Sequence, residues 1–175
     1  MDKDGTTKRL QEFVAHTSRT NCINIGRSTG TVLVTGGDDF LVNVWAVGRT
    51  GALLSLPGHT SPVTCVCFDK KEEAVLAGSQ KATIKLFDLE GAKVKRTIAG
   101  HRAAVTALDF HTLGNFFASG SMDTNMKLWD TRSRECVCSY KGHSEGVTAV
   151  CFSPDSKWVA TASTDGSVKV GTSFH

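Results

Sequence analysis

The chain has 175 residues, of which 40% are hydrophobic and 21% are charged, a composition typical of a folded globular protein and not of a disordered one. No apolar run approaches the ~20 residues that a membrane-spanning helix requires, and no apolar stretch follows the mixed-charge start MDKDGTTKR, which argues against a signal peptide. The formal net charge of +3 is too small to indicate nucleic-acid binding. We therefore expect neither a membrane nor a nucleic acid as a partner.

The first predicted element is a strand over residues 10–14, LQEFV. The glycine-rich segment IGRSTGTV around Gly26 and Gly30 follows. It lacks the Gly-Lys-Ser/Thr ending of a phosphate-binding loop, and no helical pattern comes after it. We interpret it as a hairpin turn between two strands.

A repeat organises the rest of the chain. The pair Gly-His recurs every 42 residues, at His59, His101 and His143, and an aromatic residue recurs at the same interval, at Trp45, Phe87 and Trp129. A period of this length is typical of repeat architectures. We expect repeats at about 16–57, 58–99, 100–141 and 142–171, between a flexible N-terminus (1–7) and an off-pattern tail (171–175).

Each repeat reads as four short strands. In the second copy, the β-branched and alternating segments predict strands over residues 63–68, 74–77, 83–88 and 94–98, joined by turn-forming links. No window has a sustained period of 3.6 residues, so we expect no helix. A four-stranded repeat with Gly-His near its start and Trp-Asp near its end predicts an all-β fold built of propeller blades, over residues 8–170.

The six cysteines have no C-x-x-C spacing of the kind that zinc sites and redox motifs use. We expect small buried side chains of a protein from a reducing compartment. These residues are Cys22, Cys65, Cys67, Cys136, Cys138 and Cys151.

A histidine, a hydroxyl residue, an aspartate and a tryptophan recur at fixed places in the repeat. In such a set the carboxylate accepts from the imidazole, the imidazole bonds to the hydroxyl, and the hydroxyl accepts from the indole N–H, so every buried polar group has a partner. We expect complete structural relays in the first and third repeats. The members are His16, Thr35, Asp39 and Trp45, and then His101, Ser119, Asp123 and Trp129.

The second repeat departs from this pattern, because Ala77, Lys81 and Phe87 stand at the hydroxyl, aspartate and tryptophan positions. His59 is therefore expected to be a solvated loop residue or, as the alternative, part of a binding patch.

The Ser-His-Asp content of the third repeat could also indicate nucleophilic catalysis. The set recurs in other repeats, however, and no G-x-S-x-G elbow surrounds Ser119. We interpret it as structural and expect no enzyme. His101 and His111 lack a third ligand at metal spacing, so we also expect no metal and no cofactor.

Partner contacts are expected on the loops before the first strands and in the turns between the second and third strands, because a rigid scaffold with variable loops suits binding. Each candidate can also be read as a solvated loop residue. The candidates are Arg19, Asp38, Ser61, Gln80, Lys81, Arg102, Met122, Glu145 and Thr164.

The segments GHRAAVTALDF and ASGSMDTNMKLWD resemble the WD-repeat family of β-propellers. Within it, the opening EFVAHTS and the turn SMDTN are most similar to the regulatory WD-repeat subunits of katanin. This resemblance implies a non-catalytic scaffold that targets an ATP-dependent microtubule-severing complex. The alternatives are an adaptor of another complex, such as a ubiquitin ligase or signalling scaffold, and, less favoured, a propeller enzyme.

The same resemblance implies protein partners, namely the katanin catalytic ATPase and microtubule, centrosomal or axonemal proteins. It implies a place in the cytoplasm, on the cytoskeleton at centrosome, spindle or cilium. In that family the ATPase binds a C-terminal domain beyond the propeller, which we do not expect within these 175 residues.

The fourth repeat keeps His143, Thr161 and Asp165, but Gly171 stands at the tryptophan position, and the pattern stops near Val170. The family implies rings of six or seven blades. We therefore expect an incomplete propeller with exposed strand edges; the alternative is a closed four-blade ring completed by residues 10–14.

Overall fold

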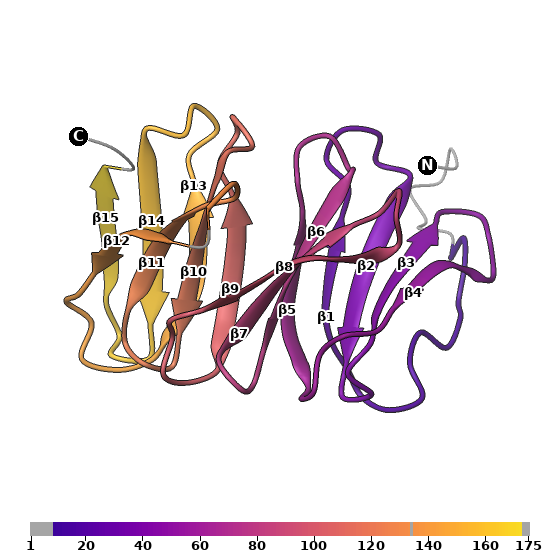
Figure 1. The fold of residues 1–175 in the computed structure, drawn as a ribbon, viewed down its shortest axis with the longest axis horizontal. Helices are drawn as coiled ribbons and strands as arrows, with labels where there is room; N and C mark the ends of the chain where they lie inside the picture. Colours follow the sequence, from indigo (N-terminus) through magenta and orange to yellow (C-terminus); the bar gives the residue numbers. More distant parts are fainter. Residues whose placement is uncertain (1–8, 134, 173–175) are drawn as a thin grey trace, which may run out of the picture.

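The computed structural model describes residues 9–133 and 135–172. This part of the chain consists of strands joined by turns and loops (Figure 1), which confirms the all-β fold class. Within it there is no helix of a length and hydropathy that would cross a membrane. The flexible N-terminus expected at residues 1–7 lies outside the described residues.

The strands form four antiparallel sheets, which we call blades 1 to 4. Blade 1 contains β1 (Thr20–Ile25), β2 (Val32–Gly37), β3 (Val42–Ala46) and β4 (Ala52–Leu56). Blade 2 contains β5 (Val63–Phe68), β6 (Ala74–Ser79), β7 (Thr83–Asp88) and β8 (Lys93–Ala99). Blade 3 contains β9 (Val105–Phe110), β10 (Phe116–Ser121), β11 (Met126–Asp130) and β12 (Cys136–Tyr140). Blade 4 contains β13 (Val147–Phe152), β14 (Trp158–Ser163) and β15 (Val168–Thr172).

The blades follow one another in an open row. The first strand of each blade contacts the first strand of the next, from β1 through β5 and β9 to β13. Blades 1 and 4 lie at opposite ends of the molecule, on the right and the left of Figure 1. The described chain is therefore an incomplete ring, and the closed four-blade alternative is wrong.

The repeat pattern predicted the inner strands well. The segments 63–68 and 83–88 coincide with β5 and β7, whereas β6 and β8 are each two residues longer than the predicted 74–77 and 94–98. At the far end, β15 continues through Thr172, two residues beyond the expected end of the pattern.

The predicted strand at residues 10–14 is wrong, because these residues have no strand pairing. To form a strand, residues 10–14 would have to pair with the free edge of β15. That edge lies at the other end of the row of blades (Figure 1). The segment lies instead along blade 1. The ring of Phe13 packs on Trp45 with centroids 4.4 Å apart, and the side-chain oxygen of Gln11 accepts from the Gly48 nitrogen at 2.8 Å.

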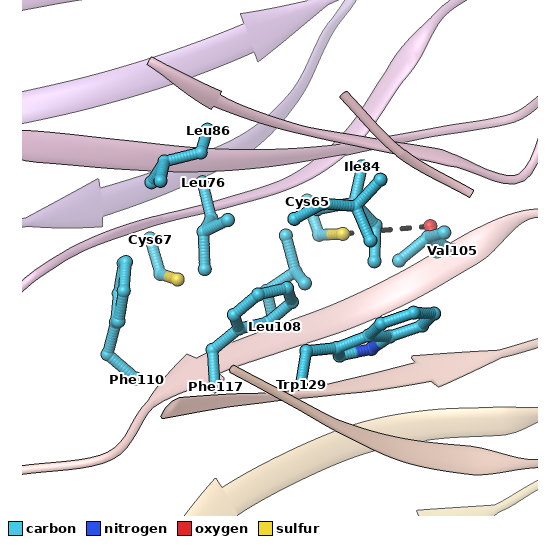
Figure 2. Close-up of a cluster of buried hydrophobic side chains, with 11 residues drawn as sticks. Cys65, Cys67, Leu76, Ile84, Leu86, Val105, Leu108, Phe110, Phe117 and Trp129 are labelled. Carbon is cyan, nitrogen blue, oxygen red and sulfur yellow. Dashed lines mark hydrogen bonds between the residues drawn. The ribbon is translucent and has the colours of Figure 1, made fainter. Parts of the chain in front are cut away.

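Apolar side chains between the blades form the core. The cluster between blades 2 and 3 runs from Cys67 and Leu76 on one side to Phe117 and Trp129 on the other (Figure 2). Burial of such side chains is the main favourable contribution to folding. This burial holds the row of blades together although the ring is not closed.

A repeated interlock sets the spacing of the blades. In blades 2 to 4, the valine that opens the first strand packs against a glycine on the second strand of the preceding blade, as Val105 does on Gly78 and Val147 on Gly120. A Cβ added to Gly78 or Gly120 would lie 2.7 or 2.6 Å from the valine Cγ1, closer than packed carbon atoms approach. Glycine is therefore required at these positions.

The expectation that all six cysteines are buried is wrong for three of them. Cys65 and Cys67 are buried, whereas Cys136, Cys138 and Cys151 are exposed. The exposed three lie on β12, the outer edge of blade 3, and on β13 of the last blade. β12 is the edge strand of its sheet, and within the described residues no blade follows the one that contains β13.

Candidate functional site

The complete relay of blade 3 joins two strands, a loop and a turn through four side chains. The Nδ1 of His101 lies 2.8 Å from the Asp123 carboxylate, and its Nε2 lies 2.6 Å from the Ser119 hydroxyl. The indole of Trp129 donates to the same hydroxyl at 2.8 Å. The loop before β9, the strands β10 and β11 and the turn between them are thus fixed together.

Blade 1 repeats this geometry with a threonine in place of the serine. The Nδ1 of His16 lies 2.8 Å from the Asp39 carboxylate, and its Nε2 lies 2.9 Å from the Thr35 hydroxyl. The indole of Trp45 donates to Thr35 at 3.0 Å. The structure therefore brings together both sets of residues that the sequence grouped.

The aspartates of the relays are held as carboxylates. Burial alone would raise the pKa of Asp123, but hydrogen bonds from the Arg102 nitrogen, His101 and the Asn125 nitrogen outweigh it, so the pKa lies below its usual value. A charged carboxylate keeps the imidazole proton on Nδ1. The Nε2 atom of His101 then accepts from Ser119.

Blade 4 has the same arrangement without the aromatic member. His143 lies 2.9 Å from the Asp165 carboxylate through Nδ1 and 2.9 Å from the Thr161 hydroxyl through Nε2. Gly171 lies in β15 opposite Val159, at the register position that Trp129 occupies opposite Phe117 in blade 3.

His59 in blade 2 is not a solvated loop residue, so that expectation is wrong. Its side chain is 7% exposed, and neither ring nitrogen has a hydrogen-bond partner among the described residues. Burial first, and then the Lys85 ammonium, lower its pKa to about 4, an effect that the nearby Ala77 backbone offsets only weakly. The surrounding blade buries the His59 ring, although other residues replace the hydroxyl, aspartate and tryptophan that accompany this histidine in the complete relays.

The Ser119 hydroxyl is unsuited to nucleophilic attack. The residue is 0% exposed, and its oxygen already bonds to His101 and Trp129. A nucleophile must reach the substrate and have a site for the reacting atom beside it. Ser119, His101 and Asp123 resemble a catalytic triad in their arrangement, but here they form part of the packed interior.

Seven of the nine candidate contact residues are exposed at the loop end that carries the relay histidines. These are Arg19, Gln80, Lys81, Arg102, Met122, Glu145 and Thr164. Asp38 is partly buried and accepts from Asn21 at 2.6 Å. Ser61 is 4% exposed, and its hydroxyl accepts from the Lys81 nitrogen at 3.2 Å, so the structure does not place Ser61 on this surface.

Sequence reasoning missed a cavity of about 400 Å³ at the opposite end of the blades, where the first strands end. Its lining includes Asp109, whose carboxylate accepts from the Phe152 nitrogen at 2.8 Å and lies 4.0 Å from the Arg27 guanidinium. Burial raises the pKa of Asp109. Among the described residues, no group of three histidine, cysteine or acidic side chains could hold a metal ion.

A row of antiparallel blades, three of four strands and one of three, interlocked by valine and glycine and tied in blades 1, 3 and 4 by His–Asp–hydroxyl relays, defines a β-propeller repeat protein. The chain matches the family model described as WD domain, G-beta repeat, over residues 7–46, 51–88, 92–130 and 134–170. It belongs to the WD40-repeat family.

Curated proteins with similar sequences show a more specific resemblance than the family model does. Katanin p80 WD40 repeat-containing subunit B1 homolog KTN80.2 of Arabidopsis thaliana is 52% identical over 71 residues, which are 41% of this chain and 6% of that protein. Katanin p80 WD40 repeat-containing subunit B1 of Danio rerio is 50% identical over 80 residues, which are 46% of this chain and 12% of that protein.

A more distant relative is the angio-associated migratory cell protein of Homo sapiens, 28% identical over 78 residues, or 45% of this chain and 18% of that protein. The resemblance to katanin regulatory subunits is confirmed over less than half of the chain. The aligned part is a small share of each katanin subunit.

Proposed function

We propose that this chain is a non-catalytic interaction scaffold that serves a katanin-type microtubule-severing complex as a targeting or regulatory component. The observation that carries the proposal is an identity of 50–52% with katanin p80 subunits over 71–80 residues. The identity with the other WD40 relative is 28% over a similar length, so family membership alone does not account for the higher value.

The structure supports a binding role over a catalytic one. The polar sets that could carry chemistry are buried and mutually bonded, whereas the loops beside them present Arg102 and Glu145 to solvent. A rigid framework with exposed loops at one end is suited to holding a protein partner. No cofactor is part of this proposal.

The proposed partners are the katanin catalytic ATPase and proteins of the microtubule, centrosome or axoneme. The corresponding location is the cytoplasm, on the cytoskeleton. The second candidate function is that of an adaptor in another complex, such as a ubiquitin ligase or a signalling scaffold. It is favoured only by the match of all four repeats to the general WD40 model.

The test is affinity capture with the purified full chain, mixed in separate reactions with the purified katanin ATPase and with stabilised microtubules. We expect retention of at least one of them. A chain with Arg102→Glu and Glu145→Lys, both on the exposed loops, is the matched control. Failure to bind either target, together with capture of ligase or signalling components from cells, would replace the katanin proposal by the adaptor.

A further inference from the structure

A second, smaller cavity lies beside Gly171, between blade 4 and the outer strands of blade 3. It has a volume of about 120 Å³, and its wall includes Tyr140, His143, Val159, Thr161 and Lys169. The wall is mainly apolar, with one buried hydroxyl on Thr161. An apolar cavity of about 150 Å³ in another protein stays dry and binds benzene, so this volume suits one small aromatic ring system.

In the other three blades an aromatic side chain fills the corresponding place. Trp45, Phe87 and Trp129 are all buried there, with Phe87 and Trp129 at 0% and 1% exposure. In blade 3 the ring of Trp129 lies against the backbone of Gly100, where an added Cβ would be 2.8 Å from the ring. In blade 4 a Cβ added to Gly142 would instead meet the aliphatic stem of Lys169, at 3.7 Å.

The cavity also keeps the hydrogen-bond acceptor that an indole uses. Trp45 and Trp129 donate to the hydroxyls of Thr35 and Ser119. The equivalent Thr161 is 7% exposed. It bonds to His143 and lies 3.4 Å from the Lys169 carbonyl.

The Thr161 hydroxyl has a single proton, which it donates to one or the other of these two acceptors. The proton of His143 faces Asp165, so Nε2 accepts, and a carbonyl can only accept. Among the described residues, no N–H group donates to the Thr161 oxygen. Thr161 lines the cavity, and its oxygen therefore keeps the capacity to accept that the indole N–H uses at Thr35 and Ser119.

We propose that this cavity is a binding site for a planar aromatic group with a ring N–H, of the indole type, which donates to the Thr161 hydroxyl. The ring occupies the space beside Gly171 that tryptophan fills in blades 1 and 3. The ligand is either a free indole compound or a tryptophan side chain of a partner protein. The inference does not depend on the proposed katanin role.

The first test titrates the purified full chain with indole and with indene, the carbon analogue without the N–H, by ligand-observed NMR. We expect indole to bind about fivefold more tightly, which corresponds to one net hydrogen bond of about 1 kcal/mol. The variant Thr161→Val should remove the difference. Equal affinities for indole and indene on the unaltered chain would overturn the proposal, and this comparison needs no variant to fold.

The second test fills the cavity. Gly171→Trp should abolish indole binding and raise the melting temperature, whereas Gly171→Ala, whose Cβ would lie 3.8 Å from the Tyr140 ring, should leave binding intact. Undiminished indole binding by a folded Gly171→Trp chain would contradict the assignment. N-acetyl-tryptophanamide distinguishes the two possible ligands. If it binds as tightly as indole, the ligand is a tryptophan side chain of a partner protein. If it does not bind, the ligand is a free indole compound.

Discussion

Glu72 of blade 2 accepts a hydrogen bond from the backbone nitrogen of Ser28 in blade 1, with 2.7 Å between Oε1 and the nitrogen. The same carboxylate accepts from the nitrogen and hydroxyl of Thr29, at 2.9 and 2.7 Å. The glycine-rich loop that resembles a phosphate-binding loop in sequence therefore binds an anion, and that anion belongs to the neighbouring repeat.

Replacement of Glu72 by alanine should loosen the contact between blades 1 and 2. We expect a loss of about 1 kcal/mol in the free energy of unfolding, since hydrogen bonds to an exposed carboxylate are partly screened by water. Chemical denaturation at pH 7 measures it. The adjacent Glu73→Ala is the control, and equal losses for the two variants would contradict the role given to Glu72.

The stabilisation by Glu72 should also depend on pH. Burial opposes ionisation, but the bonds from Thr29 and Ser28 together outweigh it and lower the pKa of Glu72. A depressed carboxyl pKa stabilises the fold above the ordinary glutamate value of about 4.3 and ceases to do so as the pH falls through the folded value. The difference in melting temperature between the unaltered chain and Glu72→Ala should therefore shrink in acid.

His59 should make the fold sensitive to mild acid. Its pKa is about 4 in the fold and about 6.5 in an unfolded chain, so the unfolded chain binds the extra proton between these values. Stability then falls as the pH decreases from 6.5 to 4, by up to ~3 kcal/mol from this group. His59→Leu should remove this component and be nearly neutral at pH 7.5; an unchanged pH profile would show that the ring is not buried in solution.

The relay of blade 3 should contribute measurably to stability. Asp123→Ala leaves the buried His101 and the exposed Arg102 nitrogen without their acceptor, and an orphaned buried group costs roughly 1–3 kcal/mol. We expect a loss of about 2–4 kcal/mol in thermal or chemical unfolding. Lys81→Ala, at the equivalent position of blade 2, should change stability little, and similar shifts for both would refute the relay.

Charge reversal on the loop end should separate binding from folding. Arg102→Glu and Glu145→Lys alter exposed side chains and should weaken partner capture without lowering the melting temperature. Capture assays and thermal unfolding on the same preparations check this. Normal capture by both variants would show that the partner binds elsewhere.

Local features of the sequence were sufficient to predict much of the fold. Alternating residues and turn-forming links define β5 and β7, and the 42-residue period aligns His101 and His143 with their aspartates. These signals lie within one repeat. They need no knowledge of how the repeats pack.

The errors concern relations between distant residues. The strand at 10–14 required an edge that no local pattern places beside it. The burial of His59 depends on the packing of its blade, and the bonds of Glu72 reach 43 and 44 residues back along the chain. A composition of small and polar residues gives no sign of such contacts.

The valine–glycine interlock makes the repeats non-interchangeable. Ala162 pairs with Ala149 in blade 4, in the register where Gly120 pairs with Ala107 in blade 3, so the glycine is missing from the fourth repeat. A shuffled chain that placed this repeat before one opening with valine would force its Cβ into the valine methyl. Gene duplication or design could extend the row at this end only by substituting Ala162 with glycine or by opening the added repeat with a smaller side chain.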